Sequence, residues 1–184
     1  MRKRTSISLG LFATTLLACG HALAAGNNGF YIGGGIGSAI VDVRELQFSE
    51  RDTAFKVLAG YALSDFIAVE AAYFDGGDPR KENGSNAVVV STNGYNASIV
   101  LRARTGSEFI LFGKIGYAEY NFEIAQLQDN EPVAVDERSD RDLTLGLGFT
   151  YKLFDRWLFR LEYERADVSG TDFQLASFVA GIQF

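Results

Sequence analysis

Residues 26–184 contain no cysteine, no histidine and no methionine, because Met1, Cys19 and His21 all lie within the first 25 positions. Proline occurs only at Pro79 and Pro132. These absences exclude disulfides, thiol nucleophiles, Cys/His metal sites and histidine acid/base catalysis from residues 26–184. We therefore expect no catalytic residues, no metal and no cofactor.

Basic residues are also scarce. Of the 17 Lys and Arg, three lie at positions 2–4, so residues 26–184 carry 14 basic against 23 acidic side chains, a net charge of −9. Phosphate binding depends on clustered Lys and Arg, so a nucleic-acid partner is disfavoured.

The first 25 residues resemble a cleaved secretory signal peptide. A basic start is followed by the uncharged apolar stretch Thr5–Ala18 and by the small-x-small site Ala22-Leu23-Ala24. The stretch is too short to span a membrane as a helix. Leu16-Leu17-Ala18-Cys19 looks like a lipoprotein signal, although Leu17 is unusual there, and we expect ordinary cleavage that discards Cys19. The prediction is a signal peptide over 1–25 and one domain over 26–184.

From Gly29 onward, apolar residues recur with period two, which predicts strands and not helices. Eight strands are expected, over about 29–41, 53–62, 66–75, 87–104, 108–122, 139–153, 157–166 and 173–184. Their connections alternate between short turns and long polar loops, the latter expected over about 42–52, 75–86, 123–138 and 166–172. This alternation is typical of an up-and-down antiparallel meander.

One face of every predicted strand is free of charge and bulky, as in Phe55, Val57, Ala59 and Tyr61. The other face carries glycines and charges, among them Gly33, Gly35 and Lys56. The interior of an eight-stranded barrel is too narrow for so many large apolar side chains. We therefore predict an all-β, eight-stranded antiparallel transmembrane β-barrel, with apolar residues toward lipid and glycines with paired charges inside.

Aromatic residues fall at the strand ends, where the two membrane interfaces would lie. The predicted girdle residues are Tyr61, Tyr151 and Trp157 beside short turns, and Tyr73, Tyr95, Tyr117 and Tyr163 beside long loops.

Five segments carry a family resemblance: Gly29–Gly37, Phe55–Tyr61, Ala68–Phe74, Gly113–Ala118 and Arg160–Glu164. They resemble the small eight-stranded outer-membrane barrels of Gram-negative bacteria, similar to the OmpA transmembrane domain and the opacity-type surface proteins. The resemblance implies location in the outer membrane. The ending with Phe178, Ala180, Ile182 and Phe184 resembles the signal read by the barrel-assembly machinery, which implies that machinery and periplasmic chaperones as partners during insertion.

Six charged residues are expected in the lumen: Lys56, Glu70, Lys114, Arg160, Glu162 and Glu164. Lys56 and Glu70 are predicted to lie about one diagonal step apart on neighbouring strands. Charges in a narrow barrel must pair, since an uncompensated buried charge costs several kcal/mol. The cluster predicts a closed salt-bridge plug, with a gated small-ion path as the alternative.

The long loops are the expected binding region. The segment from Asp129 to Asp142 mixes acidic residues with two arginines. Such a run is typical of a solvated surface, and the alternatives are divalent-ion bridging to lipopolysaccharide and adhesion to a host or neighbouring surface. We expect an outer-membrane protein with a structural, surface-interaction or adhesion role. The alternatives are a narrow porin and a lipid-modifying enzyme, which the missing histidine disfavours.

Overall fold

The computed structural model describes residues 29–43, 48–84, 86–106, 108–128, 131–154, 156–168 and 171–184. The expected signal peptide, with Cys19, lies outside these residues. The described strands are β1 (Gly29–Val43), β2 (Phe48–Ala62), β3 (Ile67–Asp75), β4 (Arg80–Asn83), β5 (Asn86–Arg104), β6 (Phe109–Gln128), β7 (Glu131–Leu153), β8 (Trp157–Val168) and β9 (Thr171–Gln183). In this part of the chain no helix is long and apolar enough to cross a membrane.

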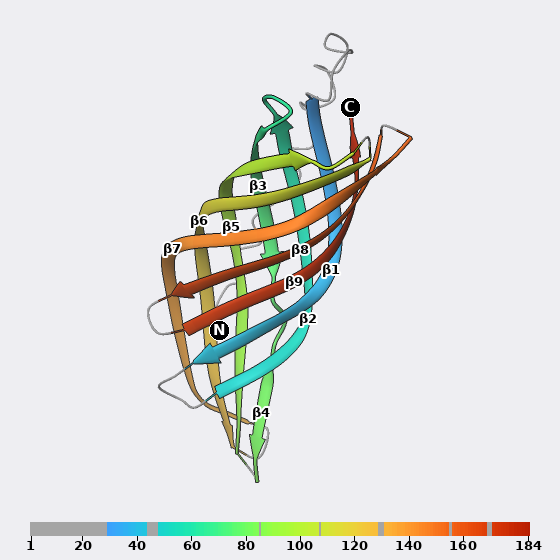
Figure 1. Ribbon diagram of the computed structural model, residues 1–184. Coiled ribbons are helices and arrows are strands. Elements are labelled where there is room, and N and C mark those ends of the chain that lie inside the picture. Colours follow the sequence, from blue (N-terminus) through green and yellow to red (C-terminus); the bar gives the residue numbers. More distant parts are fainter. Residues whose placement is uncertain are drawn as a thin grey trace, which may run out of the picture.

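The strands form a closed antiparallel barrel (Figure 1). Strands that follow one another in the sequence pair, except β3 and β4. In addition, β1 pairs with β9, and β3 pairs with β5. The ring therefore contains eight strands, and β4 is a short extra strand on the edge of β5 outside the ring. This confirms the predicted up-and-down barrel.

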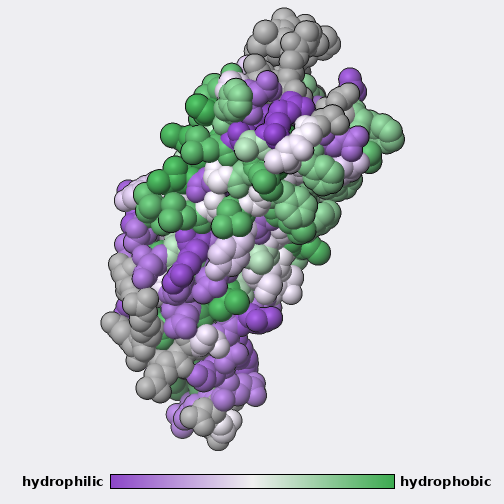
Figure 2. All heavy atoms as spheres, in the orientation of Figure 1, coloured by the Kyte–Doolittle hydropathy of each residue, from purple (hydrophilic) through white to green (hydrophobic). Residues whose placement is uncertain are grey.

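The faces of the barrel wall follow the period-two pattern. Outward-facing Ile36 and Leu147 are 59% and 64% exposed, whereas inward-facing Lys56 and Glu70 are 2% and 4% exposed. Figure 2 shows hydrophobic residues spread over the upper and middle part of the molecule and hydrophilic residues gathered toward the lower end, where Figure 1 places β4. We call this lower end the long-loop end and the opposite end the short-turn end.

Two expectations about the long-loop end are wrong. Strand β2 begins at Phe48, β6 extends to Gln128 and β7 begins at Glu131, so the connections expected over 42–52 and 123–138 are largely strand. The same holds for the connection expected over 166–172, because β8 extends to Val168 and β9 begins at Thr171. Residues 80–83, expected in a loop, form β4. Lipid no longer selects apolar outward residues beyond the membrane, so the alternation that revealed the other strands is lost there.

At the long-loop end the polarity of the wall reverses. The strand extensions bury apolar side chains inward, and Val41, Val168 and Phe173 pack in one cluster with Phe122 and Ile124 from the opposite side of the barrel. The β8-β9-β1-β2 extensions and the β5-β6 extensions thus share a core, as two packed sheets of a water-soluble protein do. The barrel is inside-out within the membrane and has the ordinary arrangement beyond it.

Candidate functional site

The lumen holds the only concentration of buried charge among the described residues. The six predicted residues come from four strands: Lys56 from β2, Glu70 from β3, Lys114 from β6, and Arg160, Glu162 and Glu164 from β8. Each is at most 7% exposed. Three cations and three carboxylates therefore meet with balanced formal charge.

The ion pairs run across the lumen and not along neighbouring strands. Lys114 Nζ lies 2.5 Å from a Glu162 oxygen, 2.6 Å from Glu164 and 3.4 Å from Glu70. Lys56 Nζ lies 2.9 Å from Glu162 and also bonds to Glu164. Each lysine therefore bridges both carboxylates of β8, which compensates much of the cost of removing these charges from water.

Arg160 closes the cluster on the short-turn side. Its Nη1 lies 2.6 Å from Glu70 and 3.5 Å from Glu162, and its Nε donates to Thr150 Oγ1 at 3.3 Å. The guanidinium lies over the Phe112 ring, 4.5 Å from its centroid, and 5.7 Å from the centroid of Tyr31. These contacts hold Arg160 in one position.

The expected proximity of Lys56 and Glu70 is wrong. In the β2–β3 register Lys56 lies opposite Phe74 and Glu70 lies opposite Gly60, so the two charges are four residues apart along the pair. A prediction based on adjacent strands cannot find their true partners, which reach them through the barrel interior.

Polar neighbours complete the cluster, and two of them were not predicted as site residues. Tyr31 Oη donates to Glu70 at 3.0 Å, and Asn96 Nδ2 donates to Glu164 at 3.2 Å. Tyr31 needs Gly60, because a Cβ at that position would lie 2.2 Å from the tyrosine ring. The period-two pattern could have identified both residues, because each lies on the inward face of its strand, next to an outward apolar residue.

An aromatic layer lies on the long-loop side of the charges. The rings of Phe74, Tyr120 and Phe173 contact one another, with centroid separations of 5.2–5.3 Å. These residues come from β3, β6 and β9 and are about 2% exposed. The expectation that glycines and charges alone fill the lumen is therefore incomplete, because apolar layers lie at both ends of the ionic cluster.

On the short-turn side of the charges is a small cavity of about 20 Å³, lined by Arg102, Thr150, Arg160 and Gln183 among others. This is room for about one water molecule. Within the described residues, no group of three or more His, Cys, Asp or Glu side chains is placed to hold a metal ion.

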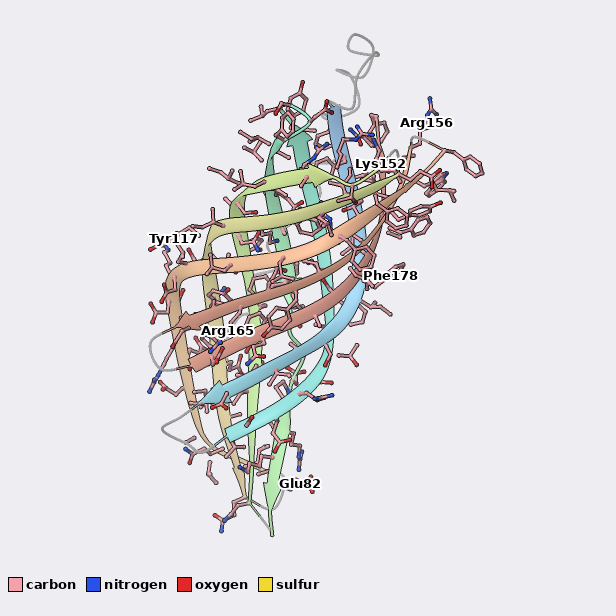
Figure 3. The ribbon with its side chains drawn as sticks, in the orientation of Figure 1. Glu82, Tyr117, Lys152, Arg156, Arg165 and Phe178 are labelled. Carbon is pink, nitrogen blue, oxygen red and sulfur yellow. The ribbon has the colours of Figure 1, made fainter. Side chains whose placement is uncertain are left out.

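The predicted girdle tyrosines and Trp157 lie on the outer wall. Tyr95 and Tyr117 are 61% and 58% exposed, and Tyr117 projects from the barrel in Figure 3. Tyr73 lies directly opposite Tyr95, with centroids 5.0 Å apart. At the short-turn end, Tyr151 packs on Phe109 at 4.9 Å. Trp157 lies opposite Leu153 on the neighbouring strand, and Tyr61 lies opposite Phe30 on the other side of the barrel. Tyr163 on β8 bonds through its hydroxyl to Gln174 at 2.8 Å.

The last strand is fully integrated into the barrel. Phe178, Ala180 and Ile182 face outward on β9, which pairs with β1 on one edge and β8 on the other. The Phe184 N–H donates to the Phe30 carbonyl at 2.9 Å, and their rings stack at 6.1 Å. Any recognition of the β9 backbone by another strand must therefore precede closure of the barrel.

A closed ring of antiparallel strands with an apolar outer wall and an ionic interior defines an integral β-barrel membrane protein. Residues 10–184 match the model of the outer membrane protein beta-barrel domain, so the chain belongs to this family and is an outer-membrane protein.

Solved structures share the fold. Ail, the attachment invasion locus protein of Yersinia pestis, solved in complex with the heparin analogue sucrose octasulfate, aligns with a TM-score of 0.61 and 15% identity over 85% of this chain and 99% of that one. Neisserial surface protein A aligns with a TM-score of 0.64 and 14% identity, over 84% of this chain and 97% of that one. OprG from Pseudomonas aeruginosa aligns with a TM-score of 0.54 and 15% identity, over 85% of this chain and 96% of that one. Comparison with curated protein sequences finds no significant match.

Proposed function

We propose that this protein acts as a surface-interaction or adhesion protein of the outer membrane, with no chemistry and no solute transport of its own. The observation that carries the proposal is the closed lumen. A charge-balanced cluster of six buried residues is covered on its long-loop side by a layer of three contacting rings. With the interior filled, the outer surface is what the protein offers to other molecules.

The closed lumen argues against the narrow porin. An ion would have to separate Lys56 and Lys114 from the two glutamates that each of them bonds, and then displace the rings of Phe74, Tyr120 and Phe173. Breaking a buried pair costs about 3–5 kcal/mol. Steady conductance is therefore not expected from this interior.

The lipid-modifying enzyme is disfavoured on chemical grounds. Residues 26–184 have no histidine or cysteine to act as base or nucleophile. Glu162 and Glu164, two residues apart on β8, are both bonded to lysines inside the barrel. A substrate in the membrane could not reach them.

The long-loop end supplies the proposed contact surface. With the family's orientation, short turns face the periplasm and this end faces the exterior. Its extended strands are a stable platform, because they share the buried apolar cluster described above. Lipopolysaccharide surrounds the barrel there, and a host or neighbouring surface is the proposed further partner. The acidic β6–β7 hairpin makes a sulfated polyanion, such as the ligand of the Ail complex, an unsuitable ligand here.

Export and assembly complete the proposal. Residues 1–25 direct secretion and are removed, periplasmic chaperones carry the chain, and the pattern ending at Phe184 is read by the barrel-assembly machinery. The outward aromatic residues then fix the barrel depth at the two interfaces.

Two measurements on one preparation test the function. Purified protein in planar bilayers should give no steady conductance, and cells that display it should adhere to a surface or partner cell better than cells lacking it. A steady large conductance would overturn the closed-lumen proposal, and unchanged adhesion would overturn the interaction role.

A further inference from the structure

Strand β7 is much longer than its partner on one side. It pairs with β6 from Glu131 to Tyr151, but with β8 only from Leu145 to Leu153. Among the described residues no strand pairs with the other edge of β7 from Glu131 to Thr144. In Figure 1, β7 continues beside β6 toward the lower tip, past the end of β8.

The hydrogen-bond pattern identifies the groups at this edge. The Lys152 N–H donates across the β6–β7 ladder to the Glu108 carbonyl at 2.8 Å, and antiparallel pairing alternates, so even-numbered residues of β7 face β6. The N–H groups of Arg141 and Leu143 instead bond to the carboxylates of Asp140 and Asp142, at 2.9 and 2.6 Å. Side chains thus occupy donors for which no strand acceptor is present, and an added strand would take the place of these two carboxylates there.

The same pattern places the N–H and C=O groups of Glu137 and Ser139 on the open edge. Exposed edges of this kind are where an extended polypeptide adds as a further strand. The opposite edge of the extension differs, because there β4 already pairs with β5.

The charge along the open edge is acidic. From Glu131 to Thr144 the sequence has five acidic residues against Arg138 and Arg141. Glu137 lies directly opposite Glu123 of β6 in the ladder, both exposed, and like charges in that arrangement are destabilising. A basic side chain next to Glu137 on an added strand would relieve this repulsion.

Apolar contacts are available at both ends of the edge. Near the tip, Val133 and Val135 are 61% and 53% exposed. At the other end of the edge, where β7 and β8 diverge, a groove of about 460 Å³ is lined by Leu143, Leu145, Tyr163, Ala166 and others. Arg165 at this groove is paired with Asp172 at 2.6 Å.

We infer that the open edge of β7, from Val133 to Leu143, binds an extended basic polypeptide segment by strand addition. The segment spans about 34 Å, carries Lys or Arg in its middle, and has apolar residues at its ends. Backbone hydrogen bonds supply affinity, and the acidic edge supplies the preference for a basic partner. This inference names the partner of the proposed surface-interaction role and rests on it.

The test measures fluorescence anisotropy of labelled twelve-residue peptides with the full-length protein in lipid nanodiscs. Three probes are used: an alternating lysine–valine peptide, the same peptide with alternate backbone nitrogens methylated, and an alternating glutamate–valine peptide. Only the first should bind. Equal binding of the methylated peptide would overturn strand addition, and equal binding of the acidic peptide would overturn the charge preference.

Variants locate the site. Glu137→Lys should weaken binding of the lysine–valine peptide about tenfold, whereas Glu50→Lys, the same charge change on β2, should change it less than twofold. Ser139→Pro removes an edge N–H without touching the β6 ladder and should abolish binding, with retained heat-dependent gel mobility showing that the barrel is folded. Equal loss in Glu50→Lys would overturn the assignment.

Light scattering tests whether a second copy of the protein occupies the open edge of β7 instead. If the protein dimerises in nanodisc-free detergent, and Ser139→Pro abolishes the dimer, the edge binds a second copy and the inference is overturned. Absence of peptide binding together with intact cell adhesion overturns only the inference. Absence of adhesion with peptide binding preserved overturns the proposed function instead.

Discussion

Lys114 on β6 and Glu162 on β8 are joined by a 2.5 Å ion pair across the lumen, although β7 lies between their strands in the wall. The pair therefore ties together parts of the barrel that share no backbone ladder. Lys114 also contacts Glu70 and Glu164, so its ammonium compensates carboxylates from two strands.

Removing this ammonium should strongly destabilise the barrel. In Lys114→Met, Lys56 and Arg160 remain against three buried carboxylates, and we expect the free energy of unfolding to fall by about 3–5 kcal/mol. The double variant Lys114→Met/Glu162→Gln restores charge balance and should recover part of the loss. Urea unfolding in lipid vesicles measures both.

The control for this prediction is Arg165→Met, which breaks the exposed pair with Asp172. It should cost at most about 1 kcal/mol. A loss in Lys114→Met no larger than in Arg165→Met would contradict the view that the lumen charges are energetically coupled.

Two glycines in the barrel wall should respond differently to the same substitution. A Cβ at Gly148 would lie 2.2 Å from the Leu161 carbonyl oxygen, whereas a Cβ at Gly113 would meet only the Gly146 carbonyl, at 3.9 Å. Gly148→Ala should destabilise by about 1–3 kcal/mol, and Gly113→Ala should be neutral or slightly stabilising. Thermal unfolding monitored by gel mobility compares them, and a larger loss at Gly113 would be inconsistent with the packing described.

The reversal of polarity along the barrel predicts a position-dependent cost of charge. Leu147→Arg places a cation on the lipid-facing wall and should lower the free energy of unfolding by about 2–4 kcal/mol. Val135→Arg changes a residue of similar exposure beyond the girdle and should be within about 0.5 kcal/mol of the parent protein. Equal costs in vesicle unfolding would refute the placement of the membrane.

Deleting Phe184 should impair insertion in cells. The residue stacks on Phe30 and ends the outward pattern of β9. The fraction of heat-modifiable protein in the outer membrane measures assembly, with Phe178→Leu as a control that keeps an outward apolar side chain. Normal assembly of the truncated chain would remove the proposed assembly role.

The sequence predicts the membrane part of this barrel well because lipid constrains it. Wherever a strand crosses the bilayer, an outward position such as Leu145 must be apolar, and the period-two pattern reveals both the strand and its faces. Beyond the girdle the constraint disappears. Residues 133–141 of β7 are exposed on both faces, and β4 consists of four polar residues, so neither carries the pattern.

The lumen is less predictable than the wall. The period-two pattern alone places Lys56 and Glu162 inside the barrel. Only the closure of the barrel brings them together, since 106 positions separate them in the sequence. The layer formed by Phe74, Tyr120 and Phe173 went unpredicted for a related reason. Its residues face inward near the long-loop end, where apolar side chains belong to the interior and no longer to the lipid side.

The most direct test of the inside-out arrangement uses the absence of cysteine from residues 26–184. The variants Leu147→Cys and Val135→Cys of residues 26–184 each contain a single cysteine, to which a bimane fluorophore is attached. Each labelled variant is then refolded into vesicles that contain lipids with nitroxide-labelled acyl chains. Our account predicts strong quenching of the label at position 147 by the nitroxide lipids, and quenching at position 135 only by aqueous iodide. A label at position 147 that iodide quenches and the lipids do not would contradict it.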